Sequence, residues 1–181
     1  TLFRSAIYAE GSWGMPATIL SISNNEIKNA QHNAIYLKHW NGATINANKI
    51  DGTSIGNGIN IELANATMLD GNQIKNVAAT GIALNNSANS TVKNSTIDKT
   101  GADGINIADS KSVLVGWNTI TNTAQDGIDL NGVSDQTEIK RNTLNSIGGN
   151  GVVISTAQKV KVNTNKIGLL GGAENIAGHG I

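Results

Sequence analysis

The sequence has few of the residues that make covalent crosslinks, chain kinks and aromatic cores. It contains no Cys, a single Pro at position 16, and only three Trp, two Tyr and one Phe in 181 residues. Without Cys, disulfides and thiolate metal sites are excluded. After Pro16 every residue keeps its backbone N–H, so strands can form throughout the rest of the chain.

The chain also lacks a charge excess and a long apolar run. Its 13 basic and 13 acidic side chains give a formal net charge of zero, which provides no electrostatic basis for binding nucleic acid. No run of about eighteen apolar residues occurs, so no membrane span is predicted. The length is that of one domain.

What the chain does have is a repeat with a period of 23 or 24 residues. The segment Asp103-Gly-Ile-Asn-Ile recurs with small changes on either side. The small residue of each copy is Ala34, Gly58, Gly81, Gly104, Gly127 or Gly151. A period of this length is typical of stacked solenoid architectures.

A second pattern, aliphatic-x-x-Asn-x-aliphatic, keeps the same period half a repeat out of phase. Its central residues are Asn25, Asn48, Asn72, Ser95, Asn118, Asn142 and Asn165. We expect this column to lie in turns, where Asn tolerates left-handed backbone and its amide bonds to neighbouring chain. We therefore predict a structural role for the column.

The two patterns predict an all-β solenoid of about seven coils. The alternation in Ile59-Asn-Ile61 places Ile inward and Asn outward, and we expect two short strands per coil and almost no helix. A leucine-rich repeat is the rival fold. It needs additional Leu upstream of the Asn, where this chain has Ala64, Thr67, Ser87 and Ser90.

The ends of the chain do not follow the repeat. Residues 1–16 lack both patterns, so we expect an irregular or artefactual segment there and the solenoid over 17–181. Because the chain has no initiator Met and Gly180-Ile181 resembles the start of another repeat, we expect an internal piece of a longer protein.

Taken together, the repeats resemble the right-handed parallel β-helix of the pectin-lyase-like superfamily. The resemblance covers roughly residues 17–167, and the repeat style is nearest that of mannuronan C5-epimerases. It implies a secreted or cell-surface protein that acts on, or binds, an acidic polysaccharide. Proteins with a fold of this kind have several different activities, so the activity has to be inferred from the residues of the site.

The residues before the repeated Gly include two carboxylates on neighbouring coils, Asp103 and Asp126, with Asp129 nearby on the strand. Carboxylates this close would repel, so one would keep its proton and act as an acid while another stays ionised. They could instead share Ca²⁺. The alternative is that Asp and Asn before Gly are ordinary turn residues.

Two family motifs overlap this segment. Asp126-Gly-Ile-Asp129 resembles a polygalacturonase segment in which the first Asp is catalytic, although the paired Asp of the next coil is replaced by Gly149-Asn150. Gly127 and Asp129 also match the Gly and Asp of the epimerase motif Tyr-Gly-Phe-Asp-Pro-His. The full catalytic set of either family is not present, so the resemblance leaves catalysis open.

A second cluster follows the first two repeated strands. Lys38 and His39 could hold a uronate carboxylate and Trp40 could stack on a sugar, with Glu62 and Tyr36 beside them. Outward Asn60 and Asn106 could add hydrogen bonds. The alternative is that these side chains only decorate a turn.

The sequence thus supports two functions. The first is part of a secreted carbohydrate-active protein, an epimerase or lyase, that acts on an acidic polysaccharide. The second is a non-catalytic module of a surface adhesin or phage tailspike that binds polysaccharide; a tailspike module would form a homotrimer.

Overall fold

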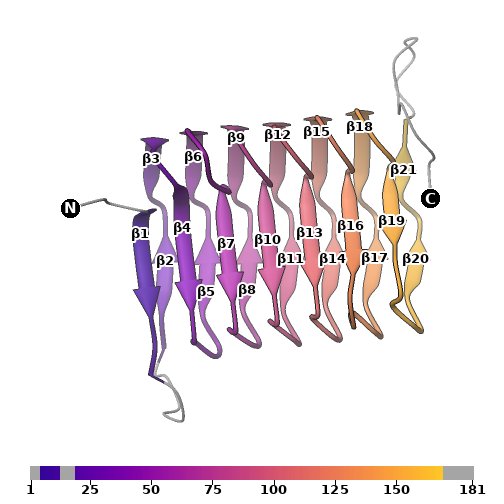
Figure 1. Ribbon diagram of the computed structural model, residues 1–181, viewed down its shortest axis with the longest axis horizontal. Coiled ribbons are helices and arrows are strands. Elements are labelled where there is room, and N and C mark those ends of the chain that lie inside the picture. Colours follow the sequence, from indigo (N-terminus) through magenta and orange to yellow (C-terminus); the bar gives the residue numbers. More distant parts are fainter. Residues whose placement is uncertain (1–4, 13–18, 169–181) are drawn as a thin grey trace.

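The computed structural model describes residues 5–12 and 19–168, which form a rod of stacked coils (Figure 1). Each coil contributes one strand to each of three parallel sheets, which we call A, B and C. The described residues contain no helix, and hence none that could cross a membrane. The predicted all-β solenoid of about seven coils is confirmed, since every sheet has seven strands.

The strands follow one another in the order A, B, C along the chain. Sheet A contains β1 (Ser5–Glu10), β4 (Asn33–Lys38), β7 (Ile59–Glu62), β10 (Ile82–Asn85), β13 (Ile105–Ala108), β16 (Ile128–Asn131) and β19 (Val152–Ile154). Sheet B contains β2 (Ser21–Ser23), β5 (Thr44–Asn46), β8 (Met68–Asp70), β11 (Thr91–Lys93), β14 (Leu114–Gly116), β17 (Glu138–Lys140) and β20 (Lys161–Asn163). Sheet C contains β3 (Glu26–Ala30), β6 (Lys49–Thr53), β9 (Gln73–Val77), β12 (Thr96–Thr100), β15 (Thr119–Thr123), β18 (Thr143–Ile147) and β21 (Lys166–Ile167).

The number of strands per coil differs from the expected two. Sheet C is the additional one, and it escapes the period-two pattern because a left-handed residue interrupts each of its five-residue strands. In β9, Asn76 has φ 55°, so the inward side chains Ile74 and Val77 are three residues apart instead of two.

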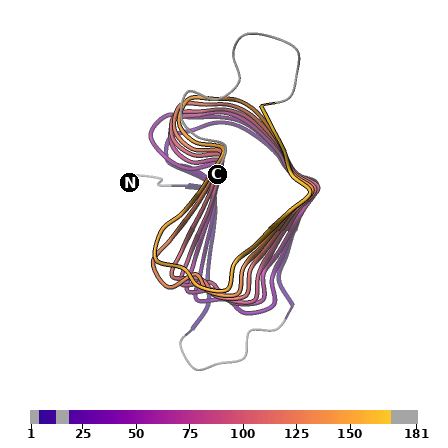
Figure 2. The ribbon, with the colours of Figure 1, turned by 90° about the vertical axis from the view of Figure 1, so that its right-hand side faces the viewer.

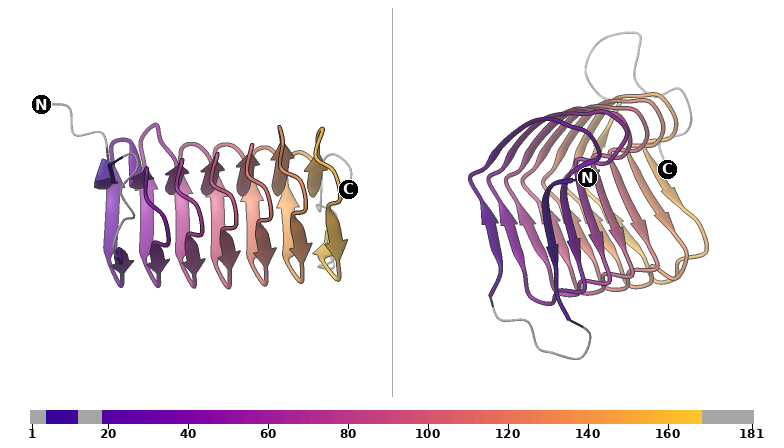
Figure 3. Two further views of the ribbon diagram at one scale, coloured as in Figure 1. Left: turned by 90° about the horizontal axis from the view of Figure 1, so that it is seen from below. Right: turned by 60° about the vertical axis from the view of Figure 1, so that its left-hand side comes forward.

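The coils stack in register one on the next (Figures 2 and 3), and the core between the sheets is a stack of aliphatic side chains. Ile59, Ile82, Ile105 and Ile128 are Cα partners along sheet A, and each has 0% exposure. A single short strand could not bury such a face, so the stacking itself supplies the hydrophobic stabilisation.

The repeated Gly has a packing reason. A Cβ at Gly81 would lie 2.6 Å from the carbonyl oxygen of Gly104 on the next coil and 2.6 Å from Cγ2 of Ile97. Both are closer than carbon and its neighbours can approach. Gly therefore recurs at this corner from position 58 onward, where a Cβ would keep one coil from settling on the next, while Ala34 is accommodated at the first copy.

The predicted irregular segment is partly regular. Ser5–Glu10 forms β1 and pairs in parallel with β4, with Ile7 opposite Ile35. The boundary at residue 17 stays a prediction, and most of the remaining residues of that segment lie outside the described part of the chain.

Candidate functional site

The Asn column lies between sheets B and C and forms a continuous hydrogen-bond ladder. Asn48 donates from Nδ2 to Asn72 Oδ1 at 3.0 Å, and Asn118 donates to Asn142 Oδ1 at the same distance. Each buried amide also reaches back to a main-chain carbonyl, as Asn118 does to Val92 O at 3.0 Å. Six members, Asn25, Asn48, Asn72, Asn118, Asn142 and Asn165, follow this pattern.

Two details of this column differ from the sequence-based expectation. The left-handed backbone lies one residue earlier than the ladder Asn, for example at Trp117 with φ 58°, before Asn118. The remaining member, Ser95 in the middle of the column, has only a hydroxyl, which accepts a hydrogen bond from Asn72 N and donates one to Lys93 O. The ladder is thus weakest at its middle coil.

The column before the repeated Gly is a second ladder. Asp103 Oδ1 accepts the main-chain N–H of Asp126 at 3.0 Å, and Asp126 Oδ1 accepts that of Asn150 at 2.6 Å. Asn57 accepts from Thr80 N in the same way at 3.1 Å. These side chains therefore hold one coil to the next, which is the turn role that the sequence left as an alternative.

Asp129 stands apart from that ladder, on the outer face of β16. Its Oδ2 accepts from Asn106 Nδ2 at 3.0 Å and from Asn131 Nδ2 at 2.9 Å, so only side-chain amides hold it. The structure thus brings Asp103, Asp126, Asp129 and Asn106 together on two neighbouring coils of sheet A, as predicted.

Burial changes the acidity of two of these carboxyls. The pKa of Asp103, which is 8% exposed, is raised first by desolvation and then by the charges of Asp129 and Asp126. The Asp126 N–H, which bonds to the ionised form, partly offsets this. Desolvation likewise raises the pKa of Asp129, with Asp126 adding to the effect and Asn131 opposing it. Both groups are therefore easier to protonate than an exposed Asp.

The predicted second cluster also assembles, at the other end of sheet A. Tyr36 donates a hydrogen bond to Glu62, whose other oxygen lies 3.6 Å from Lys38 Nζ. Desolvation and Glu62 raise the pKa of the Tyr36 hydroxyl far above its usual value. His39 Nδ1 lies 3.5 Å from Glu10 Oε1. These groups largely satisfy one another.

Sequence reasoning missed two members of this cluster, Tyr8 and Glu10 of β1. The rings of Tyr8 and Tyr36 meet edge to face, with centroids 5.4 Å apart, and Tyr8 donates to Glu10. The alternation in Ala6-Ile-Tyr-Ala9 was the signal that could have found them. Trp40 packs partly buried against the core, and its role in sugar contact stays a prediction. Asn60 lies on the outer face and accepts from Asn57 Nδ2 at 3.3 Å.

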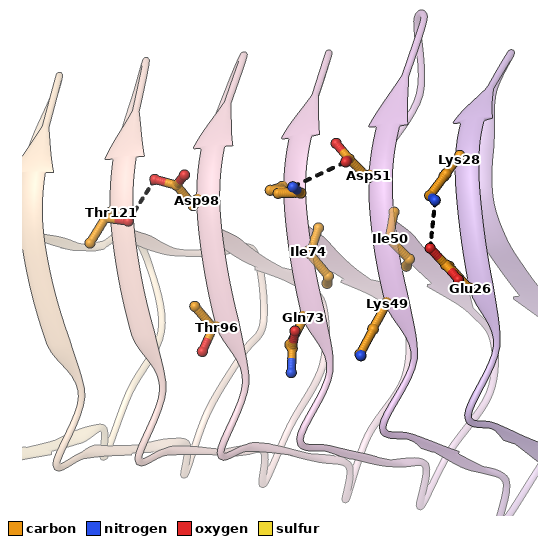
Figure 4. A pocket seen from close by; sticks show the side chains of 11 residues that line it. Glu26, Lys28, Lys49, Ile50, Asp51, Gln73, Ile74, Thr96, Asp98 and Thr121 are labelled. Carbon is orange, nitrogen blue, oxygen red and sulfur yellow. Dashed lines mark hydrogen bonds and ion pairs between the residues drawn. The ribbon is translucent and has the colours of Figure 1, made fainter.

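The hollow that the sequence did not indicate lies on sheet C. It is a groove of about 770 Å³ that crosses β3, β6, β9, β12 and β15 (Figure 4). Ile50 and Ile74 lie in its floor, and its rim carries the charged and polar side chains Glu26, Lys28, Lys49, Asp51, Gln73, Lys75, Thr96, Asp98 and Thr121. The sequence did not indicate this groove because its residues face outward from sheet C, and the period-two pattern does not reveal the strands of that sheet.

The chain was compared with known proteins. The family model described as a right-handed β-helix region matches residues 5–167. The chain belongs to this family. The comparison with curated protein sequences finds no match.

Two solved structures are similar to this β-helix chain to different extents. The A-module of a mannuronan C-5 epimerase from Azotobacter vinelandii is 13% identical, with a TM-score of 0.45, and the match covers 82% of this chain and 58% of that one. This chain thus spans less than two thirds of that module's length. HetL, a pentapeptide repeat protein from Nostoc sp. strain PCC 7120, is 9% identical over 83% of this chain and 90% of its own, with a TM-score of 0.14.

The donor set of this β-helix does not favour a metal site. In residues 5–12 and 19–168, no three His, Cys, Asp or Glu side chains gather as a metal ion would require. Asp103 and Asp126 each commit one oxygen to a main-chain N–H, which reduces what they can offer to Ca²⁺. The carboxyls of Asp103, Asp126 and Asp129 can donate or accept a proton at the solvent-facing side of sheet A.

Proposed function

We propose that this chain is part of a secreted or cell-surface protein that acts on an acidic polysaccharide at the outer face of sheet A, as an epimerase or lyase does. The observation that carries the proposal is Asp129, a carboxyl of raised pKa held outward by two side-chain amides beside Asp103 and Asp126. A carboxyl of raised pKa is a better proton acceptor when ionised than an exposed Asp, which suits it to act as a base.

The chemistry follows from the substrate. The C5 hydrogen of a uronate is acidified by the adjoining carboxylate, and a base removes it in both epimerisation and elimination. Ionised Asp129 would take that proton. In epimerisation a proton from water then returns to the opposite face of C5; in elimination the C4–O4 bond breaks, a C4=C5 double bond forms and the departing O4 takes a proton from water. Asp103, with its raised pKa, would stay protonated to higher pH than an exposed Asp and would lie beside the sugar carboxylate with less repulsion.

The amides around Asp129 fit a sugar-binding surface. Asn106 and Asn131 each have an amide N–H bonded to Asp129 and further donor and acceptor capacity that faces outward from the sheet. They fix the orientation of the carboxylate, as a positioned acid or base requires. At the far end of the same face, Lys38 would offer a cation to the polymer.

A specific observation favours the second function, a non-catalytic module of a surface adhesin or phage tailspike. Asp103 and Asp126 use their carboxylates to hold coils together, which is a structural role sufficient to explain both. Such a module would bind polysaccharide without changing it. A tailspike shaft would also sediment as a homotrimer, whereas the enzyme needs no such assembly.

Turnover assays separate the two functions. The full chain is incubated with oligomannuronate and with oligogalacturonate, and products are followed by absorbance of the unsaturated sugar and by proton NMR. We expect turnover that is lost in Asp129→Asn, a change that keeps the size of the side chain and reproduces the Asn found at the matching positions 60 and 106. Binding without turnover in the unmodified chain would establish the module instead.

A further inference from the structure

The groove on sheet C carries two rows of outward side chains with different bonding. Strand register aligns Lys28, Asp51, Lys75, Asp98 and Thr121 in one row, and Glu26, Lys49, Gln73 and Thr96 in the other. Neighbouring strands are about 4.8 Å apart and the two rows are about 7 Å apart. Figure 4 shows the rows flanking the floor of Ile50 and Ile74.

The first row is satisfied within the protein. Asp51 accepts from Asn76 Nδ2 at 2.7 Å and lies 3.1 Å from Lys75 Nζ. Asp98 Oδ1 accepts from the Thr121 hydroxyl at 2.8 Å and from Asn122 Nδ2 at 2.6 Å. This row offers little to a ligand.

The second row leaves its donors free. Over the described residues, the side chains of Lys49, Gln73 and Thr96 make no hydrogen bond and no ion pair, whereas Glu26 is held by Lys28 at 2.6 Å. An ammonium, an amide and a hydroxyl thus stand in line on three successive coils. Lys49 is the only lysine of the groove without a carboxylate within ion-pair distance.

We propose that this groove binds a linear acidic glycan along the solenoid axis, with one sugar carboxylate on Lys49 and sugar hydroxyls on Gln73 and Thr96. The class of ligand rests on the proposed function; the location and the charge spacing come from the groove. The rise from coil to coil is comparable to the length of one sugar residue in an extended chain, so successive coils meet successive sugars.

The charges specify the kind of glycan. Among the described residues, three lysines and three carboxylates line the groove; Lys28 pairs with Glu26 and Lys75 with Asp51, which leaves Lys49 as the cation and Asp98 as the anion without an ion-pair partner. A glycan with a carboxylate on every sugar would place the next charges near Asp51 and Asp98, which costs repulsion. The groove therefore takes a glycan whose uronates are separated by neutral sugars.

Three hexasaccharides of different charge spacing test this with the full chain. Isothermal titration is run with a hyaluronan hexasaccharide, in which uronate alternates with a neutral sugar, with hexamannuronate and with cellohexaose. We expect the hyaluronan hexasaccharide to bind tightest, and Lys49→Gln to weaken it about fivefold while Lys49→Arg retains binding. No binding of the hyaluronan hexasaccharide, or binding that Lys49→Gln leaves unchanged, would overturn the proposal.

A matched pair of variants tests the location. Thr96→Glu and Thr91→Glu add the same charge to outward threonines of one coil, on sheets C and B respectively. We expect Thr96→Glu to weaken binding about tenfold and Thr91→Glu to leave it unchanged. Equal losses in both would mean a general charge effect and would contradict the groove.

These experiments distinguish a failure of the groove proposal from a failure of the proposed function. Asp129→Asn alters sheet A, whereas Lys49→Gln and Thr96→Glu alter sheet C, so the two sets of variants change different faces. Binding at the groove without turnover by the unmodified chain would remove the enzyme and keep the groove. Turnover with unchanged affinity in Thr96→Glu would keep the enzyme and remove the groove.

Discussion

Two ladders of side chains connect the coils of this protein, and they differ in burial and in what they must donate. The amides of Asn48, Asn72 and Asn118 are at most 1% exposed, and each both accepts a main-chain N–H and donates to a main-chain carbonyl. Asp103 and Asp126 in the second ladder accept an N–H but are not required to donate.

The difference explains where the chain carries carboxylates. An ionised Asp has no donor, so in the buried ladder it would leave a carbonyl unpaired and a charge in the core. In the second ladder, only an acceptor is needed and solvent is close. The second ladder can therefore hold Asp or Asn with the same fold, and it places the carboxyls of Asp103 and Asp126 beside Asp129, on which the proposed chemistry depends.

Breaking the buried ladder should have the largest effect. Asn118→Leu removes the amide that bonds to Val92 O and Asn142 Oδ1 and that accepts from Ser95 N. Val92 O and Ser95 N lose this partner, whereas Asn142 Oδ1 keeps the main-chain N–H of residue 118, and we expect the free energy of unfolding to fall by about 4 kcal/mol. Urea unfolding followed by circular dichroism measures it, with exposed Thr119→Leu as the control. An unchanged unfolding midpoint for Asn118→Leu would contradict the role of the ladder.

Truncating the second ladder should cost less. Asp126→Ala removes the acceptor for both the N–H and Nδ2 of Asn150, near solvent, and we expect a loss of about 1.5 kcal/mol in the free energy of unfolding. Asp126→Asn keeps an acceptor oxygen and should unfold like the unmodified chain. Equal losses in the two variants would mean that the charge, and not the acceptor, holds the coil.

Completing the buried ladder should stabilise the protein slightly. Ser95→Asn gives the middle coil an amide that can donate to Asn118 Oδ1, as Asn48 donates to Asn72. We expect a gain of about 1 kcal/mol in the free energy of unfolding. Thermal and urea unfolding of Ser95→Asn and Ser95→Ala should shift in opposite directions; a shift of both downward would show that the coil has no room for the amide.

The smallest expected effect concerns how the free energy of unfolding depends on pH. Because the folded-state pKa of Asp103 is raised, its contribution to stability is present below its ordinary pKa and is lost as the pH rises through the raised value. Asp103→Asn removes this term. Its free energy of unfolding, relative to that of the unmodified chain, should therefore increase between about pH 3.5 and about pH 7. A constant difference across that range would place the Asp103 carboxyl at its ordinary pKa.

The sequence predicted two kinds of feature: strands whose side chains alternate with period two, and positions where the same type of side chain recurs in each coil. Inward Ile59 and Ile61, outward Asn60 and the Asn ladder are all where the periodicity puts them. Sheet C was missed because left-handed residues such as Asn76 break its alternation, and β1 was missed because it lacks the Gly-Ile motif.

The site was predictable to a lesser degree. The spacing of one repeat placed Asp103 beside Asp126, since register follows from the period. The oxygen that each commits to the next coil depends on the turn geometry, which spacing does not report. The binding role of the groove depends on which of Lys28, Lys49 and Lys75 form ion pairs. The arrangement of neighbouring strands determines this, and the sequence alone does not show it.

The central claim is that Asp126 holds the fold while Asp129 performs the chemistry. It is tested most directly by incubating oligomannuronate in D₂O with the unmodified chain, Asp126→Asn and Asp129→Asn, and measuring by NMR both deuterium at C5 and the unsaturated product of elimination. The account predicts one of the two with the unmodified chain and with Asp126→Asn, and neither with Asp129→Asn. Either signal in Asp129→Asn, or the absence of both from the unmodified chain, would contradict it.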